Sequence, residues 1–319
     1  ARVVTGRSKI VKMEGGYHGT HDLAEVSINP SLEDAGPVHR PRAVPTNPGI
    51  PKSVLEEVIV VPYNNKEVTE SIMTQHKDEI ACVIVEPMLG AVGTIAQENG
   101  YLEFLRNLTK SLNILLIFDE IVTFRLGFGG AQAMYGIKPD LTTFGKIIGG
   151  GFPVGAFGGS KDIMQVFSPR EKSFISQSGT FNGNPITMAA GISCLKMITP
   201  EVIAYINGLG DLLRAGIDTA FQKIGIKGMA TGVGSLAQPH INADRVCDFR
   251  SAAGGFFEAV AIVHLELLAK GFYIPHRGGE MSISTPMTDV EIKAFLTAFE
   301  ESLNEIKPFI EETRPELII

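Results

Sequence analysis

The chain of 319 residues has no tryptophan, only three cysteines and no apolar run of the roughly 18 residues that a transmembrane helix needs. The cysteines, Cys82, Cys194 and Cys247, are scattered and have apolar neighbours, so we expect a reduced, cytoplasmic protein and no disulfide framework. No signal peptide is expected. The net charge of −7 argues against nucleic acid or an anionic membrane as the main partner.

What the chain does contain is an ordinary globular composition, with 44% hydrophobic and 20% charged residues. Its length is sufficient for a large core and for two domains. We expect residues 1–198 to form a large domain, and residues 199–319 to form a linking helix followed by a small C-terminal domain.

The first half alternates short β-branched runs with helical patterns. These runs show little polar alternation, which is typical of a parallel sheet covered on both faces. Leucines spaced for one helix face lie between two of the runs. The alternation predicts an α/β domain with a mainly parallel sheet. The predicted strands are residues 9–13, 58–61, 82–85, 114–118 and 141–144.

The second half has clear helix signals and predicts an α+β domain. Thr199 followed by Pro200 predicts the start of a helix that runs to about residue 224. Residues 256–270 predict a helix that stops at Gly271. Thr288 and Glu291 have the spacing of a capping box. In the first half, by contrast, residues 26–53 carry six prolines and predict a long loop.

Two polar residues at predicted strand ends suggest the chemistry. Asp119 ends one buried run, and Lys146 follows a later one, before the glycine-rich residues 149–155. A carboxylate can hold a pyridine nitrogen protonated, and a lysine amine can form a Schiff base with an aldehyde. Together these groups are what pyridoxal phosphate chemistry needs, although each residue alone is equally typical of an ordinary strand end.

The alternative lysines are weaker candidates for this chemistry. Lys12, Lys161 and Lys172 lie in polar sequence contexts, and we expect no matching carboxylate beside them. Lys146, by contrast, is flanked by apolar residues. A charged lysine is costly to bury, so we expect its amine to be neutralised or paired.

The sequence around these residues resembles the class III, fold-type I aminotransferases, in the branch that holds glutamate-1-semialdehyde aminomutase and the β-amino-acid and amine transaminases. Residues 275–279 and 282–286 match this family more loosely. The resemblance implies a fold-type I large domain that binds pyridoxal 5'-phosphate, and a smaller C-terminal α+β domain. Six motifs stand in the family's order: Glu14-Gly15-Gly16-Tyr17-His18-Gly19, Val85-Glu86-Pro87, Phe118-Asp119-Glu120-Ile121, Pro139-Asp140-Leu141-Thr142-Thr143-Phe144-Gly145-Lys146, residues 149–155, and Ser178-Gly179-Thr180-Phe181-Asn182-Gly183-Asn184-Pro185.

The beginning of the chain differs from the family pattern. The string Ala1-Arg2-Val3-Val4-Thr5-Gly6 is similar to the end of a family helix. In the family, the first strand of the large domain and a Gly-Ser/Thr loop that holds the cofactor phosphate come before this point. We therefore expect an N-terminally truncated aminotransferase that holds its cofactor loosely.

The resemblance implies a cofactor role for several residues. Lys146 would form the Schiff base, and Asp119 would pair with the pyridine nitrogen. Tyr17 would stack on the cofactor ring, and Ile121 would pack against the other face.

Two further residues would support that ring site. Glu86 would support the network around the cofactor's 3-oxygen. His18 would lie behind the residues that touch the cofactor, because His18 and His21 without further partners make a poor metal site. The glycines of residues 149–155 would let chain and cofactor pack closely.

Three residues are implied in contacts with a second subunit or the substrate. Thr180 would reach the phosphate of the neighbouring subunit, which implies a homodimer with shared active sites. Arg125 and Arg277 are candidates to bind a substrate carboxylate through a bidentate fork. The Arg277 match carries one inserted residue, and Arg125 lacks a preceding glycine that the aminomutase pattern has.

The implied function is a transaminase that moves an amino group between an amine or amino acid and a ketone or oxo acid. One alternative is glutamate-1-semialdehyde 2,1-aminomutase, which uses the same parts on one substrate. A second alternative is a cofactor-poor, non-catalytic remnant of the fold. The sequence leaves the substrate and its handedness open, and small molecules are the expected partners besides a second copy of the chain.

Overall fold

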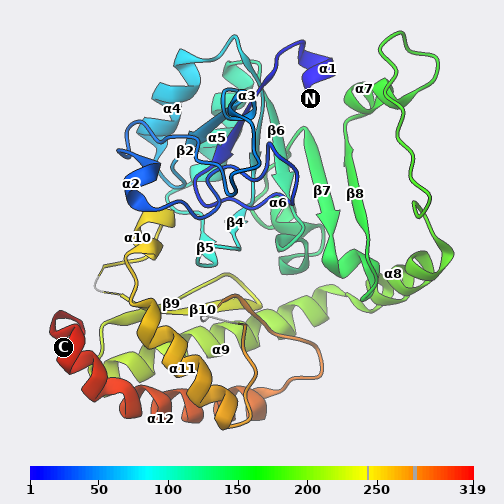
Figure 1. The fold of residues 1–319 in the computed structure, drawn as a ribbon. Helices are drawn as coiled ribbons and strands as arrows, with labels where there is room; N and C mark the ends of the chain where they lie inside the picture. The colour runs from blue at the N-terminus through cyan, green and yellow to red at the C-terminus, as the bar shows by residue number, and fades with distance from the viewer. Residues whose placement is uncertain (243, 276–278) are drawn as a thin grey trace. The chain divides into compact units, whose positions relative to one another are not determined.

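The computed structural model describes residues 1–242, 244–275 and 279–319. The chain divides into two compact units, which are drawn in Figure 1. Unit 1 contains Ala1–Pro87 and Gln97–Pro200, and unit 2 contains Met88–Ala96 and Glu201–Ile319. The domain boundary after residue 198 stays a prediction, and each unit is described by itself below.

Unit 1 is built on a six-stranded sheet with the order β2-β1-β3-β6-β7-β8. The pairs from β2 to β7 are parallel, and β8 runs antiparallel to β7. The mainly parallel α/β fold is therefore confirmed. The strands are β1 (Lys9–Met13), β2 (Val58–Val61), β3 (Ile80–Val85), β6 (Leu115–Asp119), β7 (Leu141–Gly145) and β8 (Gly155–Gly159).

The helices of unit 1 lie between these strands in the chain. In α5, Leu102 and Leu105 are fully buried, as the leucine spacing predicts. The predicted long loop of residues 26–53 also contains two single-turn helices, α2 and α3. The helices are α1 (Arg2–Thr5), α2 (Leu32–Ala35), α3 (Lys52–Leu55), α4 (Lys66–Gln75), α5 (Tyr101–Ser111), α6 (Gly130–Met134), α7 (Lys161–Met164) and α8 (Pro185–Met197).

The parallel strands of unit 1 bring the predicted site residues to one edge of the sheet. Parallel strands all end at the same edge, where open α/β sheets bind their ligands. Tyr17 and His18 follow β1, and Glu86 follows β3. Asp119 is the last residue of β6, and Lys146 follows β7 directly. The topology therefore gathers these residues from four neighbouring strands.

Unit 2 packs helices against a small antiparallel sheet with the order β11-β10-β9, and a separate hairpin joins β4 to β5. The predicted helix starts are confirmed, since α9 begins at Pro200 and Thr288 and Glu291 form a capping box. The elements are β4 (Met88–Leu89), β5 (Ile95–Ala96), α9 (Pro200–Ile224), β9 (Gly228–Thr231), β10 (Leu236–Ile241), α10 (Phe249–Ala253), α11 (Phe257–Ala269), β11 (Met281–Ser282) and α12 (Asp289–Thr313).

The core of unit 2 is formed where α9 and α12 meet. Phe221 of α9 is 1% exposed and makes an edge-to-face contact with Phe299 of α12, with ring centroids 5.5 Å apart. Phe299 in turn stacks on Phe295. Aromatic pairs of this kind add stability beyond the area that they bury.

No single helix in the described ranges is both long and apolar enough to cross a bilayer, although α8 and α9 taken together have the length and composition.

Two glycines of α9 allow a matched test of packing in unit 2. A Cβ at Gly210 would lie 2.0 Å from the carbonyl oxygen of Gly234, whereas a Cβ at Gly208 meets nothing within 4 Å. Gly208→Ala should stabilise unit 2 by about 1 kcal/mol, because alanine is the better helix former. Gly210→Ala should destabilise it by about 1–3 kcal/mol through the backbone clash. Denaturant unfolding of both variants checks this, and equal effects would contradict the packing described here.

Candidate active site

The loop after β1 carries two of the predicted site residues and is closed at its base. The Gly15 N–H donates to the Ser27 carbonyl oxygen at 2.9 Å. The Tyr17 N–H donates to Glu86 Oε1 at 3.0 Å, so the carboxylate after β3 holds this loop. The Tyr17 side chain is 43% exposed, which leaves its ring accessible to a ligand.

Asp119 is a buried carboxylate whose oxygens both accept hydrogen bonds. Its Oδ2 lies 2.8 Å from His18 Nδ1, and its Oδ1 accepts from Thr143 Oγ1 at 2.9 Å and from the Ile121 N–H at 3.2 Å. Burial raises the pKa of Asp119, but the hydrogen bonds from His18, Ile121 and Thr143 outweigh burial and lower this pKa overall. The carboxylate is therefore held ionised while only 4% exposed.

His18 is the partner that supports this charge. Burial lowers the pKa of His18, and this outweighs the opposing effect of Asp119, so the imidazole is neutral. An ionised carboxylate can only accept, so Nδ1 carries the proton that Asp119 shares. The other ring nitrogen, Nε2, is buried and has no hydrogen-bond partner among the described residues. The ring thus contributes a fixed donor to Asp119 without a second charge.

Lys146 has an unusual backbone and an accessible side chain. Its φ is 46°, in the left-handed region that residues other than glycine seldom adopt. Its side chain is exposed, and no hydrogen bond or ion pair joins it to the described residues. The expected burial of this side chain is wrong, because it is exposed in the described chain. Of its flanking apolar residues, Phe144 and Ile148 line a pocket with residues of β8 and α8.

The glycines around Lys146 allow neighbouring segments of the chain to pack closely. A Cβ at Gly145 would lie 3.4 Å from Ile121 Cγ1, which places Ile121 beside the end of β7. A Cβ at Gly150 would lie 2.4 Å from the Ala190 carbonyl oxygen, and one at Gly191 would lie 2.3 Å from the Ile148 carbonyl oxygen. The glycine run thus lets α8 pack directly on the turn that carries Lys146. This packing is a role that the sequence did not suggest.

The expectation that Lys12 lies in polar surroundings is wrong, because its side chain is buried. Its side chain is 1% exposed within β1, and its Nζ donates to the carbonyl oxygens of Ala24, at 3.0 Å, and Val26. Burial lowers the pKa of Lys12 to about 7, and the negative charge of Glu86 opposes that shift. Glu86 is therefore near enough to act electrostatically on this amine, whose hydrogen bonds go to backbone carbonyl oxygens. The signal was available in the sequence, because a lysine inside an apolar run of a two-sided parallel strand has no route to solvent.

Glu120 is a site residue that the sequence analysis overlooked. Its carboxylate is fully buried and accepts from the Thr123 hydroxyl and from the N–H groups of Ala131 and Gln132. Burial raises its pKa, and these hydrogen bonds oppose the shift. It thereby ties the segment after Asp119 to the start of α6. Gly130, with φ 80°, leaves room for this carboxylate.

Two of the three residues predicted to meet a substrate or a partner subunit are described, and they lie in different segments of unit 1. Arg125 lies half-buried in the 3-10 helix Thr123–Leu126. Thr180 is exposed in the segment between α7 and α8. Arg277 lies outside the described residues. Their predicted roles stay predictions.

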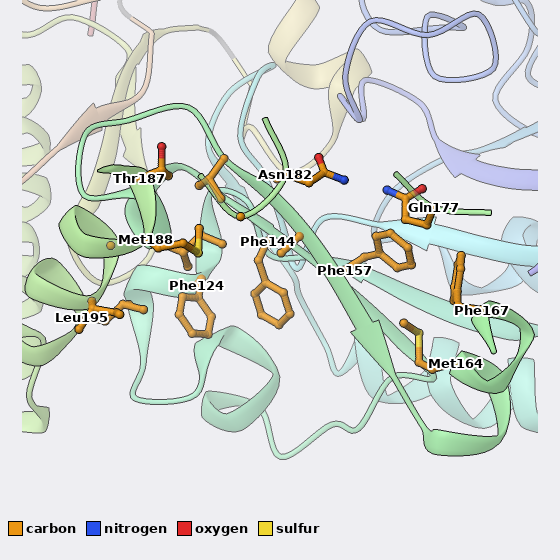
Figure 2. A pocket seen from close by; sticks show the side chains of 17 residues that line it. Phe124, Phe144, Phe157, Met164, Phe167, Gln177, Asn182, Thr187, Met188 and Leu195 are labelled. Atoms are coloured by element: carbon orange, nitrogen blue, oxygen red, sulfur yellow. The ribbon is translucent and has the colours of Figure 1, made fainter. Parts of the chain in front are cut away.

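An apolar pocket of about 770 Å³ opens between β8 and α8 (Figure 2). Phe124 and Phe144 meet edge to face on one side of it, with ring centroids 5.2 Å apart. Met188 and Leu195 line it from α8, and Asn182 adds a polar group from the preceding segment. Its lining belongs to unit 1, and none of the ionisable residues described above lines it.

The donor set at the sheet edge fits one class of cofactor. Asp119 offers a buried acceptor that is held ionised, which suits a protonated ring nitrogen. Lys146 offers an accessible primary amine, and Tyr17 offers an accessible aromatic face. A pyridine aldehyde needs these three groups.

Comparison with known proteins agrees with this chemistry. Residues 1–267 match the family Aminotransferase class-III. A glutamate-1-semialdehyde 2,1-aminomutase of Methanocaldococcus jannaschii is 39% identical over 306 residues, which are 94% of this chain and 70% of that protein.

Solved structures give the same family. An omega-transaminase from Sphaerobacter thermophilus is 38% identical with a TM-score of 0.88, and the match covers 96% of this chain and 70% of that one. A transaminase with pyridoxal phosphate bound is 31% identical with a TM-score of 0.84, over 97% of this chain and 70% of that one. The chain thus spans about 70% of the length of these proteins, and it belongs to the class III aminotransferases.

Proposed function

We propose that the chain is a transaminase that moves an amino group between an amine or amino acid and a ketone or oxo acid, with pyridoxal 5'-phosphate as its cofactor. The observation that carries this proposal is the ionised Asp119 carboxylate at the same sheet edge as the accessible Lys146 amine. Membership of the class III aminotransferases supports both the reaction type and the cofactor.

When bound, pyridoxal phosphate supplies an electron sink that weakens the C–H bond beside the amino group of the substrate. Asp119 would accept the ring N–H, and its ionised form keeps that proton on the ring. Tyr17 and Ile121 would hold the two ring faces. The Lys146 amine would take the proton from the substrate carbon and return it to C4′ of the cofactor. The exposed Lys146 side chain has the freedom that such a transfer needs.

An aminomutase is the second candidate, and one observation favours it. The relative from Methanocaldococcus jannaschii that is 39% identical carries the name glutamate-1-semialdehyde 2,1-aminomutase. Against it, Arg125 follows Thr123-Phe124 without the glycine of the aminomutase pattern. Phe124 instead contacts Phe144 beside the apolar pocket. The two candidates differ in whether amino donor and acceptor are separate molecules.

A homodimer with shared active sites is part of the proposal. Helix α8 exposes Ile186, Ile192 and Met197, which are 65%, 55% and 69% exposed, and Phe181 before it is 82% exposed. Apolar side chains gathered in this way mark a protein interface. Thr180 lies next to Phe181 in this exposed segment, so a second copy that covers α8 would meet it. We propose that Thr180 binds the cofactor phosphate held by that copy.

The first test separates the two reactions. Protein loaded with cofactor is mixed with single amine donors, namely the 1-phenylethylamine enantiomers, β-phenylalanine or alanine, and separately with glutamate 1-semialdehyde. A transaminase should convert its cofactor to the pyridoxamine form with at least one donor alone, as read by absorbance. Lys146→Ala should lose both this conversion and the visible band that borohydride bleaches. Turnover of glutamate 1-semialdehyde without any donor reaction would favour the aminomutase instead.

The second test concerns the charge of Asp119. Asp119→Asn keeps the shape but cannot hold a protonated ring nitrogen, so donor conversion should slow by on the order of 10²–10³. Thr143→Val keeps the carboxylate and removes one hydrogen bond, so it should cost only about fivefold. Stopped-flow absorbance at saturating donor measures both. Asp119→Asn with wild-type rate and spectrum would reduce this residue to a structural role.

The third test concerns the subunit interface. Ile192→Asp places a charge on the apolar face of α8 and should give a monomer, whereas Thr180→Ala should remain dimeric and bind cofactor more weakly. Analytical ultracentrifugation at micromolar concentration and absorbance titration with pyridoxal phosphate give the two readouts. A monomeric wild type would refute the shared site.

A further inference from the structure

A buried lysine remains that the proposed reaction does not use. Lys12 lies in β1 between β2 and β3, where it pairs with Val60 and Ile84. Its side chain is among the largest that are fully buried in the chain. A lysine in such a position is unfavourable for stability, because an apolar side chain of similar volume would avoid the cost of desolvating an amine. Its presence therefore needs a reason other than packing.

The contacts of Lys12 point to the loop of residues 15–27, which we name the Tyr17 loop. The Lys12 amine donates to the carbonyl oxygens of Ala24 and Val26, on the returning arm of this loop. Gly15 and Ser27 close its two ends by a backbone hydrogen bond. The amine thus ties the inside of the loop to the middle of the sheet. The outgoing arm carries Tyr17 and His18.

The same amine lies close to the charges that hold the outgoing arm. Glu86 raises the pKa of Lys12, which burial lowers, and Glu86 also accepts the Tyr17 N–H. Lys12 in turn contributes to lowering the pKa of His18, after the larger effect of burial. Hydrogen bonds thus tie the returning arm of the loop to Lys12, and the outgoing arm to Glu86 and Asp119.

We propose that Lys12 is a positioning residue for the cofactor site: its amine holds the Tyr17 loop closed, so that Tyr17 and His18 stand in place before the cofactor binds. This inference rests on the proposed function for the identity of the cofactor, and on the contacts above for the role of the loop. Without the amine, two carbonyl oxygens inside the loop lose their donor, and the loop must open or admit water to satisfy them.

Three variants separate this role from simple packing. Lys12→Met keeps a long side chain and removes both the donor and the charge. Lys12→Gln has a similar length and no charge, but its amide can still donate to one carbonyl oxygen. Lys9→Met is the matched control on the same strand, because Lys9 is only half-buried, pairs with Glu79 and donates to the Glu56 carbonyl oxygen.

Two measurements apply to each variant. Amide hydrogen exchange of the cofactor-free protein reports the closure of residues 15–27 relative to the strands of the sheet. Absorbance titration with pyridoxal phosphate reports the dissociation constant, and donor conversion at saturating cofactor reports the chemical step.

Lys12→Met should speed amide exchange in the Tyr17 loop by on the order of tenfold, and should raise the dissociation constant for pyridoxal phosphate by a similar factor. The rate of donor conversion at saturating cofactor should stay near that of wild type. Lys12→Gln should fall between Lys12→Met and wild type, and Lys9→Met should match wild type in both readouts. If Lys12→Met does not fold, the comparison of Lys12→Gln with wild type decides by the same criteria.

Unchanged loop exchange and dissociation constant in the Lys12 variants would overturn the proposal. So would a uniform rise in exchange across β1, β2 and β3 with no selective effect on residues 15–27, because that result means packing alone. A wild type that binds no pyridoxal phosphate would refute the proposed function, whereas the exchange comparison on cofactor-free protein would still decide whether Lys12 holds the loop.

Discussion

A buried carboxylate that must stay ionised is the constraint on which the proposed site depends. Asp119 is almost inaccessible to water, so protein donors must replace the hydration that its charge loses. Those donors come from His18 after β1, Thr143 in β7 and the turn after β6, and hence from three strands. A parallel sheet supplies this arrangement directly, because its strands end at one edge. The parallel sheet of unit 1 therefore supplies the hydrogen-bond donors that keep Asp119 ionised.

Most strands of unit 1 could be predicted from the sequence, because the patterns that indicate them are local. The β-branched runs predicted β1, β2, β6 and β7 to within about a residue, since two-sided burial demands continuous apolar strands. The antiparallel β8 was missed, because its sequence Gly-Ala-Phe-Gly-Gly has no β-branched residue. Its pairing with β7 comes from tertiary contact, which overrides such weak local preference.

The polar residues were harder to predict for a physical reason. Asp119 and Lys146 could be named because they end apolar runs. The burial of Lys12 could have been inferred from its apolar strand, but most partners of Glu120 and Lys12 could not. Those partners are backbone groups at least 11 residues away, namely the N–H groups of Ala131 and Gln132 and the carbonyl oxygens of Ala24 and Val26. Backbone partners carry no residue identity, so no motif records them. The backbone partners of buried ionisable side chains are therefore visible only in the folded structure.

The backbone conformation of Lys146 is a second feature that could not be predicted from the sequence. Its identity stands out in the sequence, but its left-handed backbone does not, since a residue other than glycine pays a steric cost there. The surrounding glycines let other parts of the chain pack closely around this residue. Gly150 and Gly191 let α8 lie directly on the turn, and Gly145 admits Ile121 beside it. The backbone at Lys146 is thus held by its neighbours while the amine stays free of described partners. The proton transfer proposed for Lys146 would need this combination of a fixed backbone and an accessible amine.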